Sequence, residues 1–532
     1  IVGKYHTRNI DYTYQQLLTW NHRFGKHNVD ALLGHEWYKT TYFYLFASKS
    51  NMFDRENEEL AGAITKGNAN SYTTEYNNEG WIFRGQYDYD SKYFASFSFR
   101  RDASSRFHPD HRWGNFWSLG GAWIISKESF LQDVTWLDML KIKASYGEQG
   151  NDNIGNFRYT NVYDIINSNG NPGASPVSMG NEDITWEKNG NFNAGVEFSM
   201  FNGRFTGNIE AFYRKTSDML MYFPLPTSFG YAGYYDNIGD MTNTGVEIEL
   251  GGTPIKTKNF KWDVNFNMTW YKNRISSLPE ERKGQNAYKF TDDFSSNPVK
   301  GYSSGSYFYG EGESMYSFYT YKYAGVNKEN GKALYYQYVR DENGNPTGEV
   351  TTTDNYSMAD RFLVGSALAP VYGGFSTQFT YRDFDLSLAF NYQIGGKVYD
   401  SGYANLMGSP YSTSGKGFNI HADILNAWTP ENRDSDIPRY YYGDQYNNAT
   451  SDRFITDASY LSLENINFGY TLPTKLVRKA YLSKVRVYLA CDNVWVWSKR
   501  QGLDPRQSFT GGSNNTYYAP IRTISGGLTV EF

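Results

Sequence analysis

The sequence predicts an all-β fold, a transmembrane antiparallel β-barrel that crosses the membrane with strands. Three observations lead to this prediction: apolar and polar residues alternate in many segments, the connections between these segments are short and long in turn, and the last segment ends on the aromatic residue Phe532. Each observation alone has another explanation, so the prediction depends on their agreement.

The clearest alternating segment covers residues 260–270 and reads FKWDVNFNMTW, with every even position apolar and every odd position polar. Side chains alternate between the two faces of a strand, so this segment has one apolar and one polar face. It would run roughly 35 Å, or about 25 Å of height at a tilt near 45°, which matches the apolar band of an outer-membrane barrel. Trp262 and Trp270 fit the aromatic girdles at its two edges. Taken alone, the segment fits a long strand of a soluble sandwich equally well.

Further segments with strand character follow one another through the whole chain. They cover residues 14–24, 29–37, 81–89, 93–99, 116–124, 141–147, 192–198, 205–213, 246–250, 375–381, 384–392, 461–470, 485–491 and 524–532. The alternation changes parity inside 461–470, which predicts a β-bulge near Glu464 and Asn465. Together with 260–270 these segments make about fifteen spanning strands.

The connections between these strands differ in length in a regular way. Asn202-Gly203 and Arg382-Asp383 mark tight turns, whereas long polar loops are predicted elsewhere. These long loops cover residues 38–80, 100–115, 148–190, 214–244, 271–374, 393–459 and 493–523. A membrane barrel has short periplasmic turns and long extracellular loops, and a soluble sandwich has no reason to keep that rhythm.

Two loops are expected to contain structure of their own. Within 271–374, residues 319–324 and 333–338 flank the turn Asn330-Gly331 and predict a small hairpin. The connection between the strands at 116–124 and 141–147 could include a short helical turn.

The strand count has a consequence for the extent of the barrel. Bacterial single-chain barrels have even numbers of strands, and the last strand runs inward. Counting back through the alternation, the strand at 14–24 also runs inward, so an outward strand should precede it. We therefore expect residues 1–532 to form one domain, the C-terminal part of a larger barrel. Phe532, which closes an alternating strand, has the form of the outer-membrane assembly signal.

Composition excludes several classes of protein. Hydrophobic residues make up 39% of the chain, mean hydropathy is -0.65, and no run approaches the length of an apolar membrane helix. The net charge of -5 gives no basic surface for nucleic acid. The single cysteine, Cys491, rules out an intrachain disulfide. Aromatic residues reach 18%, which suits membrane-interface belts and surfaces that stack on sugars or peptides.

Three motifs resemble those of a known family. They are GNEDITWEK at 180–188, YRKTSDML at 213–220 and NIGDMTNTGVE at 237–247. In this order they resemble the motifs of SusC/RagA-type TonB-dependent transporters. The resemblance implies a 22-stranded barrel with long extracellular loops, plugged by an N-terminal domain that carries a TonB box. We expect this chain to lack that plug, the TonB box and the first strands.

The resemblance also implies function and partners. It implies import of oligosaccharides or oligopeptides across the Gram-negative outer membrane, with a SusD-like surface lipoprotein as a lid. It further implies coupling to the TonB complex through the N-terminal region, contact with outer-membrane lipid, and no cofactor. The alternative is a soluble, β-rich carbohydrate-binding or adhesive protein, which would be monodisperse without detergent. An outer-membrane enzyme would need a localised carboxylate pair and measurable turnover.

Aromatic clusters in the long loops are the candidate contacts for cargo or for a lid protein. They can stack on sugars, hold peptides, or pack loops on each other and on a partner. The candidates are Trp428, Tyr440, Tyr441, Tyr442, Tyr231, Tyr234 and Tyr235.

No catalytic or metal-binding residues are expected. His108 and His111 form an H-x-x-H pattern beside Asp110, but the sequence suggests no third ligand for a metal. The chain has no H-E-x-x-H pattern. Adjacent carboxylates such as Glu280 and Glu281 lie in a flexible polar segment, where nothing fixes them across a cleft.

Overall fold

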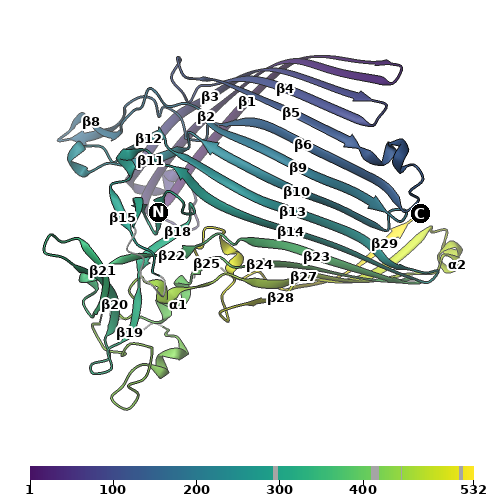
Figure 1. Cartoon of the computed structure of the whole chain (residues 1–532). Helices are drawn as coiled ribbons and strands as arrows, with labels where there is room; N and C mark the ends of the chain where they lie inside the picture. The colour runs from purple at the N-terminus through teal and green to yellow at the C-terminus, as the bar shows by residue number, and fades with distance from the viewer. Residues whose placement is uncertain (291–297, 409–418, 445, 514–518) are drawn as a thin grey trace. The chain divides into compact units, whose positions relative to one another are not determined.

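A computed structural model describes residues 1–290, 298–408, 419–444, 446–513 and 519–532 (Figure 1). The fold is nearly all β, and its main element is a 15-stranded antiparallel sheet in which neighbours in space follow chain order. In order, the strands are β1 (Val2–Phe24), β2 (His27–Met52), β3 (Ala63–Tyr89), β4 (Tyr93–Ser104), β5 (Trp113–Ile124), β6 (Leu137–Asn151), β9 (Glu187–Met200), β10 (Phe205–Ser217), β13 (Asp240–Lys256), β14 (Phe260–Ser277), β23 (Val371–Tyr381), β24 (Phe384–Ile394), β27 (Tyr460–Thr471), β28 (Lys484–Ser498) and β29 (Thr523–Glu531). The predicted fold class and strand number are confirmed.

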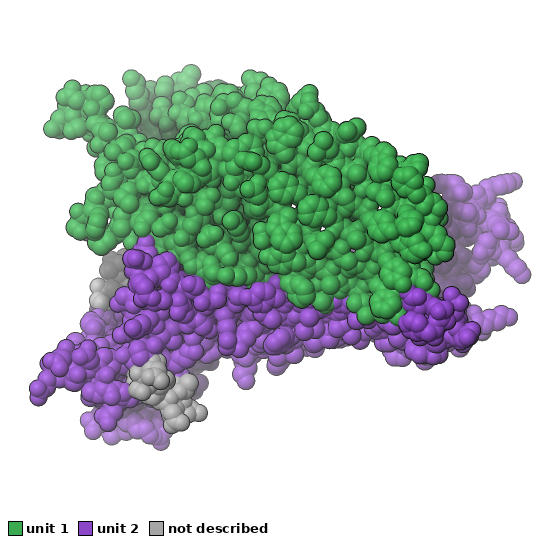
Figure 2. Space-filling model, turned by 45° about the horizontal axis from the view of Figure 1, so that its top comes forward, with its two compact units in different colours: residues 1–127, 141–194, 214–240 green, residues 128–140, 195–213, 241–532 purple. Residues whose placement is uncertain are grey.

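The chain divides into two compact units, coloured separately in Figure 2. Unit 1 comprises residues 1–127, 141–194 and 214–240. Unit 2 comprises residues 128–140, 195–213 and 241–532.

The predicted alternation within residues 260–270 is confirmed by strand β14. It pairs in register with β23, so that Trp262 lies opposite Phe379 and Phe266 opposite Phe375. The rings of Trp262 and Phe379 stack at 5.9 Å. Polar side chains lie on the other face, where Asp263 accepts a hydrogen bond from Thr253.

Apolar side chains stay exposed on one face of the large sheet. In unit 1, Leu18 is 70% and Leu119 is 55% exposed, and in unit 2 Leu489 is 61% exposed. A soluble sandwich would bury such side chains against a second sheet. Their exposure is the pattern of strands that face lipid.

Tight turns join the strands at one end, as predicted. Gly25 and Arg382 take up the left-handed conformation there, with φ of 61° and 53°. The turn after β9 uses Asn202 (φ 58°) and Gly203 (φ 72°). The bulge near Glu464 is also confirmed, because the register between β27 and β28 shifts between Leu463 and Asn465.

The prediction of a polar loop at 38–80 is wrong, since most of it is strand. β2 continues to Met52, and β3 begins at Ala63. The sequence does not reveal these strands, because neither face of the extension is continuously apolar. Apolar and polar residues therefore do not alternate with the period of two that marks a strand. The extension matters for function and is described below.

Other long loops also contain hairpins that the sequence did not reveal. The loop at 148–190 contains β7 (Val162–Ser168) paired with β8 (Asn171–Ser178), and the loop at 214–244 contains β11 (Leu220–Pro224) paired with β12 (Gly233–Asn237). The connection between β5 and β6 does include a helical turn, Ser129–Leu131.

The longest connection, 271–374, folds into two small sheets. One has five strands: β15 (Gln285–Ala287), β16 (Val299–Ser304), β17 (Tyr307–Gly310), β18 (Ser317–Tyr321) and β22 (Arg361–Ser366). The other has three: β19 (Tyr323–Val326), β20 (Ala333–Arg340) and β21 (Pro346–Thr353). The predicted hairpin around Asn330-Gly331 is confirmed as β19 and β20, with β18 as a separate strand before it.

Helices are few and short among the described residues. They include α1 (Ser401–Leu406) and α2 (Thr474–Val477), and none in the described ranges has the length and apolar character to cross a membrane. The loop between β24 and β27 also pairs β25 (Lys397–Tyr399) with β26 (Ile455–Asp457). Phe532 follows β29 and is 93% exposed, and its role in assembly stays a prediction.

Candidate functional site

The tryptophan of the first motif is a core residue of unit 1. Trp186 is 5% exposed, and its Nε1 donates a hydrogen bond to the Arg112 carbonyl at 2.8 Å. Its ring packs against Phe107 and Phe116, with centroids 5.4 and 5.5 Å away. This residue therefore organises the base of the loops.

The three family motifs meet in space. Asn237 of the third motif accepts a hydrogen bond from the Thr185 amide at 2.8 Å and donates one to the Thr185 carbonyl at 2.9 Å. Glu187 of the first motif accepts a hydrogen bond from the Leu220 amide of the second motif at 3.1 Å. The motifs thus hold the ends of two long loops together, which is a structural role.

A cleft of about 680 Å³ opens on the polar face of unit 1. Small side chains contribute to its lining, because Ser98, Ser118 and Gly147 lie in one row across β4, β5 and β6. Charged and aromatic side chains line it as well. The polar, charged and aromatic side chains in its lining include Asn78, Arg100, Asp102, Asp152, Trp186 and Asn191.

The predicted tyrosines of unit 1, Tyr231, Tyr234 and Tyr235, have similar exposure but different contacts. Tyr234 and Tyr235 are half-buried on β12, and Tyr235 packs its ring at 5.2 Å against Tyr222. Tyr231 is hydrogen-bonded to Tyr163 of the β7–β8 hairpin, and this bond raises the pKa of Tyr231 above its ordinary value. Tyr231 thus links the connection between β11 and β12 to the β7–β8 hairpin.

The predicted aromatics of unit 2 separate into packed and exposed residues. Trp428 is packed: its Nε1 donates to the Lys328 carbonyl at 3.2 Å, and its ring lies on Gly331. Tyr441 and Tyr442 are 61% and 71% exposed, and the Arg439 guanidinium lies 4.9 Å from the Tyr441 ring. Tyr440, 38% exposed, lies between these extremes. Contact of any of these residues with cargo or a lid stays a prediction.

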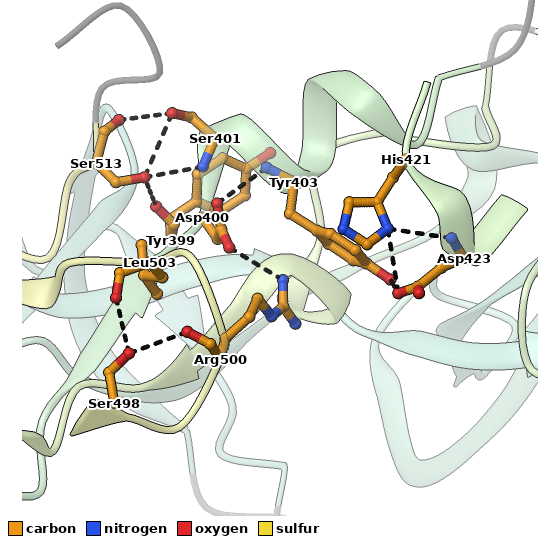
Figure 3. Close-up of polar contacts among 10 residues, drawn as sticks. All are labelled: Tyr399, Asp400, Ser401, Tyr403, His421, Asp423, Ser498, Arg500, Leu503 and Ser513. Atoms are coloured by element: carbon orange, nitrogen blue, oxygen red, sulfur yellow. Dashed lines mark hydrogen bonds and ion pairs between the residues drawn. The ribbon is translucent and has the colours of Figure 1, made fainter. Parts of the chain in front are cut away.

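A buried polar network, which the sequence did not reveal, joins two loops of unit 2 (Figure 3). Asp400 is 7% exposed and caps α1 by accepting a hydrogen bond from the Tyr403 amide at 2.9 Å. Its second oxygen lies 3.4 Å from Nη1 of Arg500, whose guanidinium stacks 4.2 Å from the Tyr403 ring. The loop before β27 is thereby fixed to the loop after β28.

The same network extends from Tyr403 to a second carboxylate. The Tyr403 hydroxyl donates to Asp423 at 2.8 Å, and the His421 ring packs edge-on to Tyr403 at 4.8 Å. Burial, followed by the hydrogen bond to Asp423, raises the pKa of Tyr403 to about 12. The aspartate before Ser401 is a recognisable helix-cap signal, but no sequence pattern links it to Arg500.

A second cavity, of about 350 Å³, lies in unit 2 under aromatic side chains that include Tyr271, Tyr460 and Phe509. Lys397 lines it, and burial lowers the pKa of this lysine. Its ammonium group donates to the Val364 carbonyl, so it anchors β22 to β25. The one charged side chain named in this cavity thus has a structural role in holding the loops together.

The H-x-x-H pattern does not form a metal centre among the described residues. His108 lies 3.5 Å from Asp110, His111 lies 3.6 Å from Asp183, and the two rings are 6.4 Å apart. Within the part of the chain that the structure describes, no three metal-ligating side chains converge.

Strand topology and the two-faced sheet define the class of protein, a β-barrel wall of the outer-membrane type. Residues 2–365 match the family model described as "TonB dependent receptor-like, beta-barrel", and the chain belongs to this family. The family consists of outer-membrane transporters and not of enzymes, in agreement with the expectation from sequence.

Individual relatives confirm the resemblance to SusC and RagA. The chain is 31% identical to the TonB-dependent receptor SusC of Bacteroides thetaiotaomicron, over 87% of this chain and 44% of that protein. It is 29% identical to TonB-dependent receptor P3 of Formosa agariphila, over 97% of this chain and 52% of the relative. The chain therefore spans about half the length of the curated relatives it matches.

A solved structure shares the fold at similar identity. The structure of the RagAB peptide transporter matches with a TM-score of 0.85 and 27% identity, covering 100% of this chain and 56% of that one. The "open-open" state of the RagAB peptide importer matches with a TM-score of 0.83.

Proposed function

We propose that this chain forms the wall of an outer-membrane transporter that imports oligomeric nutrients, either oligosaccharides or oligopeptides. The observation that carries the proposal is the 15-stranded antiparallel sheet, apolar and exposed on one face and polar on the other, in a chain that belongs to the TonB-dependent receptor family. SusC and the RagAB peptide transporter support the cargo class, since both are its relatives.

Transport through so wide a barrel requires a plug and a source of energy. A 22-stranded barrel has a plugged lumen that stays closed until the plug moves. We propose that TonB supplies this energy through an N-terminal region, and that a SusD-like surface lipoprotein closes the extracellular side as a lid. The sheet then crosses the outer membrane many times and contacts lipid through its apolar face.

Uptake in living cells tests this proposal. Cells from which the gene for this chain is deleted should lose uptake of a set of fluorescent oligosaccharides and oligopeptides, and complementation should restore it. A protonophore that collapses the inner-membrane potential should stop the restored uptake, because TonB depends on that potential. Uptake that is unchanged by the deletion would refute the proposal, and uptake that resists the protonophore would refute the energy coupling.

A further inference from the structure

The extension formed by β1, β2 and β3 (Figure 1) is far longer than a membrane requires. β2 has 26 residues, and about ten suffice to cross the apolar band at a tilt near 45°. Counting from the tight turn at Gly25, the residues beyond Trp37 lie outside the band. A sheet of three paired strands therefore continues into the extracellular space, within unit 1.

One face of this extension carries a ladder of tyrosines. The strand register places four rows side by side on this face, and every row contains at least one tyrosine. The rows are Thr7–Tyr44–Tyr72, Asn9–Tyr42–Thr74, Asp11–Thr40–Tyr76 and Thr13–Tyr38–Asn78. We refer to Tyr38, Tyr42, Tyr44, Tyr72 and Tyr76 as the tyrosine ladder.

The ladder rings contact one another across the strands. Tyr44 and Tyr72 stack with centroids 5.0 Å apart and an interplanar angle of 28°, and Tyr42 lies 6.2 Å from Tyr72. Tyr38 lies 6.2 Å from Tyr76. Tyr72 is 47% exposed, so ring surface remains available to a ligand.

Polar groups between the rings are already oriented by hydrogen bonds. The Thr40 hydroxyl donates to the side-chain oxygen Oδ1 of Asn9 at 3.0 Å, the Asn9 side-chain amide donates to Asp11 at 2.9 Å, and the Tyr38 hydroxyl lies 3.4 Å from Asp11. Hydroxyl and amide groups held in this way can exchange hydrogen bonds with a ligand at little entropic cost.

Most charges of the extension lie on the face opposite the ladder. Arg8, Lys39 and Glu75 have the other parity, and Lys39 pairs with Glu75 at 3.1 Å. In the four rows of the ladder face, Asp11 is the single charged residue. Arg106 lies 4.5 Å from the Tyr76 ring, but it is paired with Asp152 at 3.2 Å. The ladder face therefore disfavours an anionic ligand, which would need arginine or lysine donors.

The ladder leads directly into the cleft of unit 1. From Tyr72 to Asn78 the distance along β3 is about 20 Å, and Asn78 lines the cleft. Tyr76 marks the junction, since its hydroxyl donates to Asp152, another cleft residue, at 2.9 Å. Ladder and cleft form one track along the polar face.

We propose that the tyrosine ladder is a binding surface for a neutral oligosaccharide, which it passes towards the cleft; this proposal rests on the proposed transport function. Sugar rings present apolar C–H faces that stack on tyrosine and hydroxyl groups that bond to Asn and Thr. A peptide bound by strand addition needs an open sheet edge, whereas the backbone of β2 is paired on both sides by β1 and β3.

Binding to the intact transporter, purified with its natural partners in detergent, tests the ladder. The probes are cellohexaose, maltohexaose and mannohexaose as neutral glycans, hexagalacturonate as an acidic glycan, and a pool of heptapeptides, all measured by calorimetry. At least one neutral hexasaccharide should bind, and Tyr44→Ala with Tyr72→Ala should weaken it about tenfold, because aromatic anchors dominate binding energy. The variant Phe43→Ala, on the opposite face of β2, should bind normally.

Conservative variants separate binding from folding. Tyr44→Phe with Tyr72→Phe keeps both rings and should retain most of the affinity, whereas a folding defect would affect the alanine variants in all assays. Equal binding by the ladder and Phe43 variants, or binding of peptides or acidic glycans alone, would overturn the ladder proposal while uptake by cells still supports transport. Uptake that is unchanged by the deletion would overturn the transport proposal itself.

Discussion

Phe375 and Phe390 lie opposite each other on β23 and β24, with ring centroids 4.4 Å apart and planes at 11°. Phe266 lies opposite Phe375 on the other side, so three strands contribute one aromatic row. The row lies about halfway along β14, between Trp262 and Trp270. In a membrane barrel this position is near the middle of the apolar band.

A carboxylate in this row should destabilise the barrel in lipid. Phe266→Asp is expected to lower the free energy of unfolding by about 2 kcal/mol, less than Arg or Lys would at the same depth. Urea titration of the protein folded into vesicles measures this change. Asn265→Asp, one residue away on the polar face, is the control and should have little effect. Equal effects of the two substitutions would show that the even-numbered face of β14 does not meet lipid.

The sequence predicts strands well where one face must avoid water. Within 260–270 and 384–392 the membrane requires an apolar side chain at every second position, so the period of two is complete. The extensions of β2 and β3 have water on both sides, and Tyr, Thr and Asn occur on either face without a period. Their strand structure depends on pairing with each other and, for β2, also with β1, which no local pattern encodes.

Site residues were predicted less well, because their neighbours come from distant parts of the chain. Aromatic composition identified Trp428 as a loop residue, but only the fold shows that it covers Gly331. The Asp400–Arg500 pair joins residues that are 100 positions apart. Composition also pointed to Tyr440–Tyr442, whereas the tyrosine ladder lay in a segment predicted to be loop.

Removal of the Asn237 side chain should loosen the junction of the family motifs. Asn237→Ala leaves the Thr185 amide and carbonyl and the Asp218 carbonyl without their side-chain partner, at a cost of about 2 kcal/mol. Hydrogen exchange should become faster in residues 180–188 than in the intact protein. The exposed Asn171, in the hairpin β7–β8, provides a control: Asn171→Ala should leave exchange in 180–188 unchanged. Unchanged exchange in Asn237→Ala would contradict the structural role of the motif.

Alkaline pH should weaken the contact between the two loops of unit 2. The Tyr403 phenol keeps its proton in the folded state up to a pKa of about 12, compared with 10.0 for the ordinary group. Between these values the unfolded chain binds fewer protons, so stability falls as pH rises. The contribution of Tyr403 is fully present below pH 10 and is lost as pH rises through 12.

Comparison with Tyr403→Phe isolates this group from the other tyrosines of the chain. At pH 8 the variant should be less stable by about 1 kcal/mol, because it loses the hydrogen bond to Asp423. The difference between the two proteins in thermal or urea unfolding should shrink above pH 10. A difference that stays constant from pH 8 to pH 12 would mean that the pKa of Tyr403 is the same in the folded and unfolded states.

Two glycines with the same backbone conformation allow a matched test of the Trp428 contact. Gly331 and Gly344 have φ of 74° and 83°, and a methyl group at Gly344 would meet no atom within 4 Å. At Gly331 a Cβ atom would lie 2.3 Å from Cε3 of Trp428 and would have to displace the indole. Both alanine substitutions carry the backbone cost of about 1 kcal/mol, and Gly331→Ala should add about 1–3 kcal/mol for overpacking.

Limited proteolysis of the loop before β27 measures this difference, because Trp428 also donates a hydrogen bond to Lys328 and fixes that loop to the β19–β20 hairpin. Cleavage near residues 428–444 should be accelerated in Gly331→Ala and close to normal in Gly344→Ala. If both variants are cleaved at the same rate, backbone conformation alone explains the glycine at 331, and Trp428 is free to turn towards another partner.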